Sequence, residues 1–200
     1  MPTLWEKSTR PLDAIERFTV GHDRELDLYL APYDVLGSIA HTTMLGAVGL
    51  LPAADLDVLL PELRAIYRDA VEGRFVIEEG VEDVHSQVEL LLTRRLGEAG
   101  KKIHSGRSRN DQVLVDLKLF TRDALRRTAD AVVRLFDELQ RQSRRHAGVL
   151  MPGYTHLQVA MPSSFGLWFG AYAESLCDDM LLVEAAYRTA NRNPLGSAAG

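Results

Sequence analysis

Apolar residues recur along much of this chain with the three- and four-residue spacing of one face of a helix. The most regular run starts after Pro52, ends at Gly73 and comprises Leu56, Leu59, Leu60, Leu63, Ile66 and Tyr67. A second run covers 83–96 and is followed by Gly97, a typical helix stop, and a less regular run covers 34–51. The spacing predicts a helix at each of these places, and we expect a further short helix at 12–18.

The second half of the chain predicts longer helices. No Gly or Pro interrupts Asp111–Ala147, and at about 1.5 Å per residue a helix of that length would measure roughly 55 Å. Such a length is typical of an extended bundle or a subunit interface. Gly148 and Pro152 then predict a polar loop, and Pro162 suits the first turn of a helix that runs to about Ala190.

These elements predict an all-α fold. We expect a small helical N-terminal domain at residues 1–106, followed at 107–200 by the first long helices of a multi-helix bundle. The last residues, Asn193–Gly200, are mostly small and are typical of a linker, so we expect the natural protein to continue beyond them.

Composition and charge restrict the possible functions. The 200 residues are 46% hydrophobic and 26% charged, as in ordinary globular proteins, and the formal net charge is -5. This charge argues against a nucleic-acid partner, but it is compatible with a local cationic pocket for a small anion. The single cysteine excludes an intrachain disulfide and a multi-cysteine zinc site. The N-terminus lacks an apolar signal core and no apolar run is long enough to span a bilayer, so we expect a cytoplasmic protein without a membrane partner.

The first candidate site is the polar segment Ser105–Asp111, which leads into the long helix. Arg109 offers a fork of donors, Ser108 a hydroxyl and Asn110 an amide. Such groups at the positive end of a helix dipole are suited to holding a carboxylate. The alternative is a solvated helix start, in which Ser108 and Asp111 form a capping box and the arginines are surface charges.

The second candidate is the segment Gly153–Gln158, which contains His156. A histidine with an ordinary pKa of about 6.5 is suited to proton transfer near neutral pH. Thr155 and Gln158 are placed to orient a carboxylate or amide beside it. The alternative is that His156 is a loop or core histidine that hydrogen-bonds to a carbonyl.

A third polar run, Glu82–Gln87, contains His85 and has three interpretations: a metal half-site, a proton relay or an acidic helix cap. The cap is favoured, because acidic residues are common in a first helical turn. No second carboxylate-rich cluster and no His pair at metal spacing accompanies this run, so we predict no metal site.

These segments resemble the argininosuccinate lyase family of the fumarase/aspartase superfamily. The matching stretches lie at 81–89, 100–113, 151–158 and 193–200, and the similarity begins at Leu4. The strings GKKIHSGRSRNDQ and PGYTHLQ are specific to this branch of the superfamily. The resemblance implies a homotetramer with a central helix bundle and active sites each built from three subunits. It also implies cleavage of argininosuccinate to arginine and fumarate, in arginine biosynthesis, without a metal or organic cofactor.

The resemblance also implies roles for single residues. Ser108, Arg109, Asn110 and Thr155 would contact the carboxylates of the substrate, and His156 would be the catalytic histidine that serves in proton transfer. His85 lies in a stretch that faces the active site in this family.

The sequence departs from the family pattern in two places. The family's loop of the form GSSxMPxKxNP carries the serine that is the favoured base, and it does not occur in these 200 residues, so we expect them to be inactive by themselves. Where the family commonly has Asn-x-Ser near the N-terminus, this chain has Asp23 in place of the serine, which leaves that substrate contact open.

Three other functions remain open. Another lyase of the superfamily, acting on adenylosuccinate or aspartate, would share the scaffold, although the string GRSRNDQ argues against it. A non-catalytic structural protein on the same scaffold, such as the lens crystallins related to this family, is the second, and the presence of Thr155 and His156 favours activity. A helical interaction module is the third, supported by the long helix alone.

Overall fold

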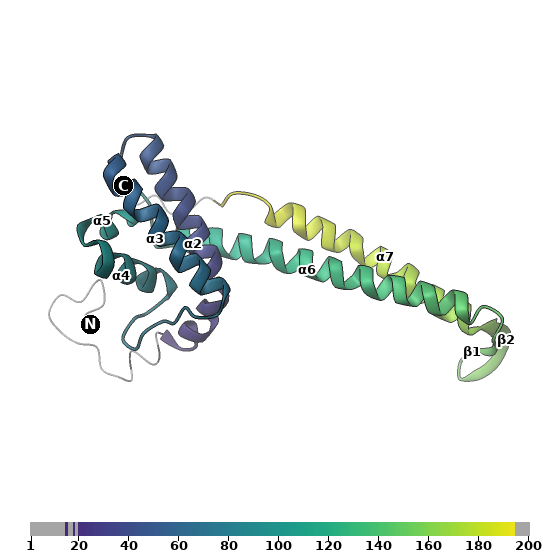
Figure 1. Cartoon of the computed structure of the whole chain (residues 1–200). Coiled ribbons are helices and arrows are strands. Elements are labelled where there is room, and N and C mark those ends of the chain that lie inside the picture. The colour runs from purple at the N-terminus through teal and green to yellow at the C-terminus, as the bar shows by residue number, and fades with distance from the viewer. Residues whose placement is uncertain (1–14, 16–17, 19, 195–200) are drawn as a thin grey trace. The chain divides into compact units, whose positions relative to one another are not determined.

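The computed structural model describes residues 15, 18 and 20–194 (Figure 1). The elements are α2 (Asp23–Ala47), α3 (Ala53–Val71), α4 (Val84–Leu96), α5 (Glu98–Lys101), the short 3-10 helix η1 (Lys102–His104), α6 (Arg109–Arg145), β1 (Leu150–Thr155), β2 (Gln158–Ser164) and α7 (Phe165–Ala190). The predicted all-α class is confirmed, since helices predominate and the strands form one small sheet. None of the helices in the described part of the chain is long and apolar enough for a membrane span.

The chain forms two compact units that divide within α6. We call the described residues up to Phe120 unit 1 and Thr121–Arg192 unit 2. The domain boundary expected at residue 106 concerns the whole protein and stays a prediction.

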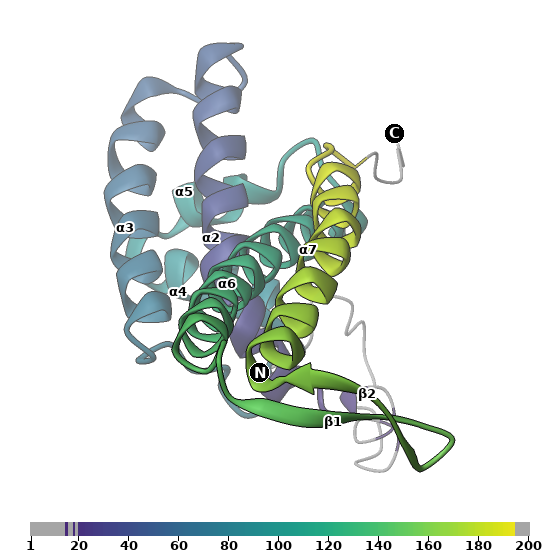
Figure 2. The ribbon, with the colours of Figure 1, turned by 90° about the vertical axis from the view of Figure 1, so that its right-hand side faces the viewer.

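Helices α2, α3 and α4 pack together around the apolar core of unit 1 (Figures 1 and 2). Its most buried side chains are Val35, Leu45, Leu59, Leu63, Ile66, Val84, Val88 and Leu92. Most of them belong to the faces that the apolar spacing predicts. Each such side chain stabilises the fold by roughly 1.5–3 kcal/mol relative to an exposed one.

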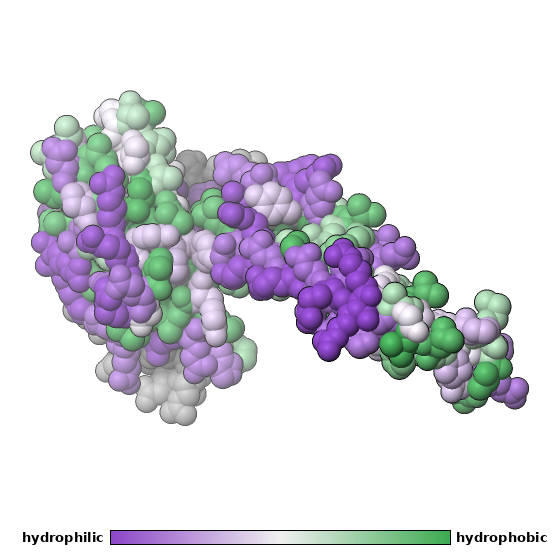
Figure 3. All heavy atoms as spheres, turned by 45° about the vertical axis from the view of Figure 1, so that its right-hand side comes forward, coloured by the Kyte–Doolittle hydropathy of each residue, from purple (hydrophilic) through white to green (hydrophobic). Residues whose placement is uncertain are grey.

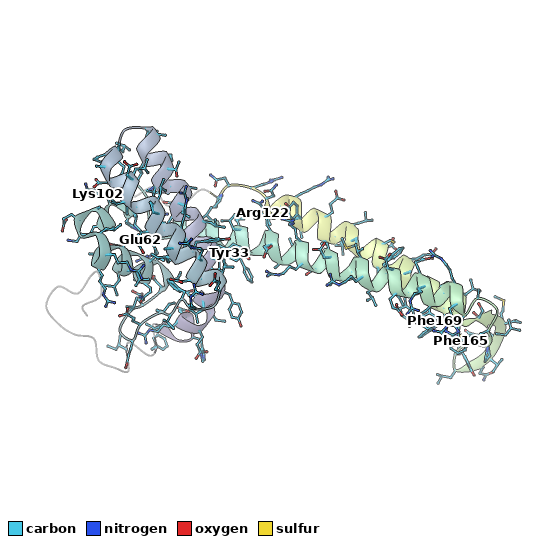
Figure 4. The ribbon with its side chains drawn as sticks, viewed as in Figure 1. Tyr33, Glu62, Lys102, Arg122, Phe165 and Phe169 are labelled. Carbon is cyan, nitrogen blue, oxygen red and sulfur yellow. The ribbon has the colours of Figure 1, made fainter. Side chains whose placement is uncertain are left out.

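Polar contacts at the edge of this core join α3 to the segments that follow it. Lys102 forms an ion pair with Asp55, and Arg95 forms one with Glu62; Lys102 and Glu62 are labelled in Figure 4. On the other side of unit 1, the ring of Tyr33 lies edge-on to that of Phe120, with 5.9 Å between ring centroids. This contact packs α2 against α6.

The helix bounds differ from the sequence prediction mainly at α2. The helix begins at Asp23, not near Asp34, and continues through Pro32. A proline inside a helix removes one hydrogen bond, and burial of Ala31 and Val35 on either side of Pro32 offsets that cost. The helix expected at 12–18 lies mostly outside the described residues.

Unit 2 consists of the rest of α6, a β-hairpin and α7. The stretch predicted to be a polar loop is instead the hairpin β1–β2, which is antiparallel and pairs Thr155 with Gln158 across a two-residue turn. Pro162 lies in β2 and does not begin the next helix. Helix α7 begins at Phe165, where the Ser164 hydroxyl caps it by accepting from the Leu167 N–H at 3.2 Å.

Helices α6 and α7 run side by side in opposite directions within unit 2 (Figures 1 and 2). They approach closely near the hairpin, where the Ser143 hydroxyl donates to the Gly166 carbonyl at 2.7 Å. A Cβ atom on Gly166 would lie 2.6 Å from the Ala147 Cα, so only glycine fits there. Apolar side chains remain exposed at the hairpin end (Figure 3), among them Leu150, Val159, Met161 and Leu167.

Candidate active site

The start of α4 provides one wall of the candidate site in unit 1. Asp83 has an extended backbone, and its Oδ1 accepts from the Ser86 N–H at 2.7 Å. This hydrogen bond satisfies one of the free donors of the first turn. The interpretation of the acidic run as a helix cap is therefore confirmed, and the same geometry turns the other oxygen of Asp83 toward α6.

Arg109, the first residue of α6, lies against this cap. Its Nη2 donates to the Ser86 Oγ at 3.3 Å, and its Nε lies 3.5 Å from the Asp83 Oδ2. The Arg109 side chain is 26% exposed, so it is neither a free surface charge nor fully enclosed. These contacts hold the guanidinium in one orientation, which the interpretation of this segment as mere surface charge does not explain.

Ser108 and Asn110 flank this arginine. The Ser108 N–H donates to the Asp111 Oδ2 at 2.7 Å, which is one half of the predicted capping box. The Ser108 Oγ is buried and has no hydrogen-bond partner among the described groups. Asn110 is exposed on the first turn of α6. We call Ser108, Arg109 and Asn110 the cradle.

Positive charge is concentrated around the cradle. Burial, and then the charges of Arg109 and Arg107, lower the pKa of His104. Burial also raises the pKa of Glu89, while Arg109 and Arg107 act on that carboxyl in the opposite direction. At both groups the arginine charges favour a negative charge nearby, although burial is the larger cause of each shift.

A buried polar cluster lies next to the cradle, and the sequence analysis missed most of it. Asp34 of α2, His85 of α4 and Asp116 of α6 are at most 3% exposed. The His85 Nδ1–H donates to the Asp34 Oδ1 at 2.7 Å, and the same nitrogen lies 3.7 Å from the Asp116 Oδ2. Burial, and then the charge of Asp34, raise the pKa of Asp116 to about 9.

The three side chains of this cluster are of types that can bind a metal ion. One ligand atom from each of Asp34, His85 and Asp116 lies within 4.8 Å of the other two, a spacing that suits a cation. However, the His85 Nδ1 is already engaged with Asp34, and the charge of Arg107 acts on both carboxylates. These residues therefore do not fit a metal, and the absence of a metal site stays a prediction.

Thr155 and His156 lie in unit 2, at the tip of the hairpin, and both are exposed. His156 and Leu157 form the two-residue turn with φ of 50° and 62°, as expected for the mirror-image turns that connect twisted strands. Leu157 is 98% exposed in this strained conformation. Of the two alternatives for His156, a loop or a core histidine, the core one is therefore wrong, because His156 is exposed in the turn of the hairpin.

The sequence signals for these residues differ in strength. Asp83 and Ser86 are recognisable as a cap, but only the fold shows that they also hold Arg109. One sequence signal could have pointed to Asp34 and Asp116. Each is an acidic residue among apolar residues of a helix, and a buried acid of this kind often has a partner. The structure joins Ser108, Arg109 and Asn110 in unit 1, and Thr155 and His156 in unit 2.

Known proteins share both the sequence and the fold. A family model described as lyase matches residues 6–200. The argininosuccinate lyase of Bacteroides fragilis is 71% identical to this chain, and the match covers 98% of this chain and 44% of the relative. The argininosuccinate lyase of Thermotoga neapolitana is 40% identical, and the match covers 98% of this chain and 50% of the relative. The chain therefore spans about half the length of these curated relatives. A crystal structure of EDDS lyase in complex with formate is 25% identical, with a TM-score of 0.75 over 96% of this chain and 39% of that one. These matches show that the chain belongs to the lyase family, within the fumarase/aspartase superfamily.

Proposed function

We propose that this chain is the N-terminal part of an argininosuccinate lyase, which cleaves argininosuccinate to arginine and fumarate by β-elimination. The observation that carries the proposal is the orientation of Arg109 by Asp83 and Ser86, in a chain that is 71% identical over 197 residues to the Bacteroides fragilis enzyme. A guanidinium fixed in this way can bind a carboxylate with two parallel hydrogen bonds.

The cradle suits the charge that develops in this reaction. Removal of a proton from the carbon beside a carboxylate shifts negative charge onto that carboxylate, and fixed donors stabilise it most where it accumulates. In the proposal, Arg109 supplies the charged donors, while Ser108 and Asn110 supply a hydroxyl and an amide. Thr155 contacts a further substrate carboxylate.

His156 is the proposed catalytic residue for proton transfer. Its imidazole is exposed at a turn whose backbone is fixed by strand pairing, so the side chain can approach a substrate held elsewhere. A carbon base and an acid for the departing guanidinium nitrogen are both needed. The family's loop serine, which is absent from these 200 residues, would be the base, so the 200 residues alone should be inactive.

The proposal extends to assembly and location. The exposed apolar side chains Leu167, Leu181 and Leu182 on α7 support association of the long helices into a homotetramer with composite active sites. In the whole protein we place the N-terminal domain at 1–106 and the start of the bundle domain at 107–200. A cytoplasmic enzyme of arginine biosynthesis that uses no cofactor or metal is the most consistent role.

The test measures fumarate release from argininosuccinate by ultraviolet absorbance, with the protein from the complete reading frame. Loss of acid–base catalysis in His156→Asn should lower kcat by about 100-fold or more. Arg109→Lys should raise KM by about 10-fold or more, because lysine cannot form the paired hydrogen bonds. Arg127→Lys is the matched control at an exposed position and should match wild type.

Two results would contradict the proposal. The first is a wild-type protein that releases no fumarate from argininosuccinate; turnover of adenylosuccinate or aspartate in the same panel would then identify another lyase of the superfamily. The second concerns the 200 residues expressed alone, whose measurable turnover would contradict the need for a downstream base.

A further inference from the structure

We propose that Asp34, His85 and Asp116, together with Arg107, form a positioning site that fixes the cradle against α2 and α4, with Asp116 in its neutral form. The inference rests on the proposed lyase function for its activity measurements. None of the four residues takes part in the ion pair of Arg109 with Asp83 or in its hydrogen bond to Ser86. They act through the backbone and helices that carry it.

The cluster joins three segments that are distant in sequence. Asp34 lies on α2, His85 follows the α4 cap by two residues, and Asp116 lies two turns into α6 after Arg109. Helix α2 approaches α6 at Gly37, where a Cβ atom would lie 3.0 Å from the Val115 Cγ1 and 3.7 Å from the Asp116 Oδ1. A shift of any one helix would therefore disturb the other two at this point.

The loop before α6 is anchored to the same place. Arg107 immediately precedes the cradle, and its Nη2 donates to the buried Ser38 Oγ at 3.0 Å, one helical turn from Asp34 on α2. Burial lowers the pKa of Arg107, while Asp34 and then Asp116 act on it in the opposite direction. The negative charge at Asp34 thus favours the charged Arg107 guanidinium, which immediately precedes the cradle.

The two acids of the cluster have different environments. The Asp34 Oδ1 accepts the hydrogen bond from His85 and its Oδ2 has no partner among the described groups, whereas neither oxygen of Asp116 has one. Burying a carboxylate without donors costs far more than burying a neutral carboxyl. Asp116 faces Asp34 and Asp27 from α2, His85 from α4 and Arg107 from the loop. Asp116, which has no hydrogen-bond donor, is therefore the acid of this site that stays neutral.

The test compares two isosteric substitutions in the full-length protein. Asp34→Asn removes the charge that balances Arg107 and should lower kcat/KM for argininosuccinate by about 10-fold or more, mainly through KM. Asp116→Asn replaces a neutral acid by a neutral amide and should lower kcat/KM several-fold less. Asp123→Asn, at an exposed position on α6, is the control for substitution alone. Equal losses in the first two variants would overturn the inference.

Two pH series provide readouts that a simple packing role would not change. Because Asp116 ionises near pH 9 in the folded protein but near 3.8 when unfolded, folding loses stability as pH rises between these values. The urea midpoint of wild type should therefore fall relative to Asp116→Asn from pH 5 to pH 9, even if wild type lacks turnover. In an active enzyme, kcat/KM of wild type should fall above about pH 9 more than that of Asp116→Asn.

Parallel urea midpoints of wild type and Asp116→Asn at every pH would overturn the inference. So would a stoichiometric divalent metal in the purified protein, since the cluster would then be a metal site. An inactive wild type with diverging midpoints would refute the lyase function while supporting the neutral Asp116.

Discussion

Asp83 has two separable roles, and substitutions can distinguish them. One oxygen caps α4 through the Ser86 N–H, and the other lies 3.5 Å from the Arg109 Nε, with side-chain exposures of 18% for Asp83 and 26% for Arg109. Asparagine is as good a helix cap as aspartate but lacks the charge. Asp83→Asn should therefore remove only the ion pair, whereas Asp83→Ala should remove both interactions.

The magnitudes follow from these contacts. Loss of an N-cap costs about 1 kcal/mol of unfolding free energy. Loss of a partly exposed ion pair costs about 0.5–1 kcal/mol. We therefore expect a destabilisation of about 1.5–2 kcal/mol for Asp83→Ala and about 0.5–1 kcal/mol for Asp83→Asn. KM for argininosuccinate, the proposed substrate, should rise in both variants by a similar factor of about 2 to 5, because Arg109 loses the same partner in each.

Stability is measured by urea unfolding of the full-length protein at one fixed protein concentration, followed by circular dichroism, with m-values compared between variants. Asp123→Ala, which breaks an exposed pair on α6, should change stability by no more than about 0.5 kcal/mol. If Asp83→Asn and Asp83→Ala destabilise the protein equally, the helix cap makes no measurable contribution to its stability. An unchanged KM in both variants would refute the positioning of Arg109.

Two further predictions concern packing and assembly. Gly100→Ala should destabilise unit 1 by about 3 kcal/mol or more, because the new Cβ atom would lie 2.4 Å from the backbone carbonyl carbon of Leu92. An unchanged urea midpoint would contradict the close approach of α5 to α4. Leu182→Glu places a charge on an exposed apolar position of α7. If α7 lies in the interface of the proposed homotetramer, the full-length variant should elute from size-exclusion chromatography as smaller species, and an unchanged elution volume would place the interface elsewhere.

Helical content could be predicted from the sequence because apolar spacing reflects a local periodicity. Leu59, Leu63 and Ile66 lie on one face of α3 whatever packs against them, and their burial agrees with that pattern. The hairpin at 150–164 was missed for a physical reason. Its turn uses His156 and Leu157 at positive φ, and it lacks the Asn-Gly or Asp-Gly pair that usually marks such turns.

The sequence by itself determined the helices, the capped start of α4 and the polar types of the cradle, because each depends on residues within a few positions of one another. Only the tertiary structure decided that Arg109 is held by Asp83 and Ser86, and that Asp34 and Asp116 meet at His85. These contacts join residues that are 23 to 82 positions apart, and no local pattern encodes which buried faces will meet. Charge in the interior depends on that meeting, because the cost of burying a carboxylate is set by the neighbours that the fold supplies.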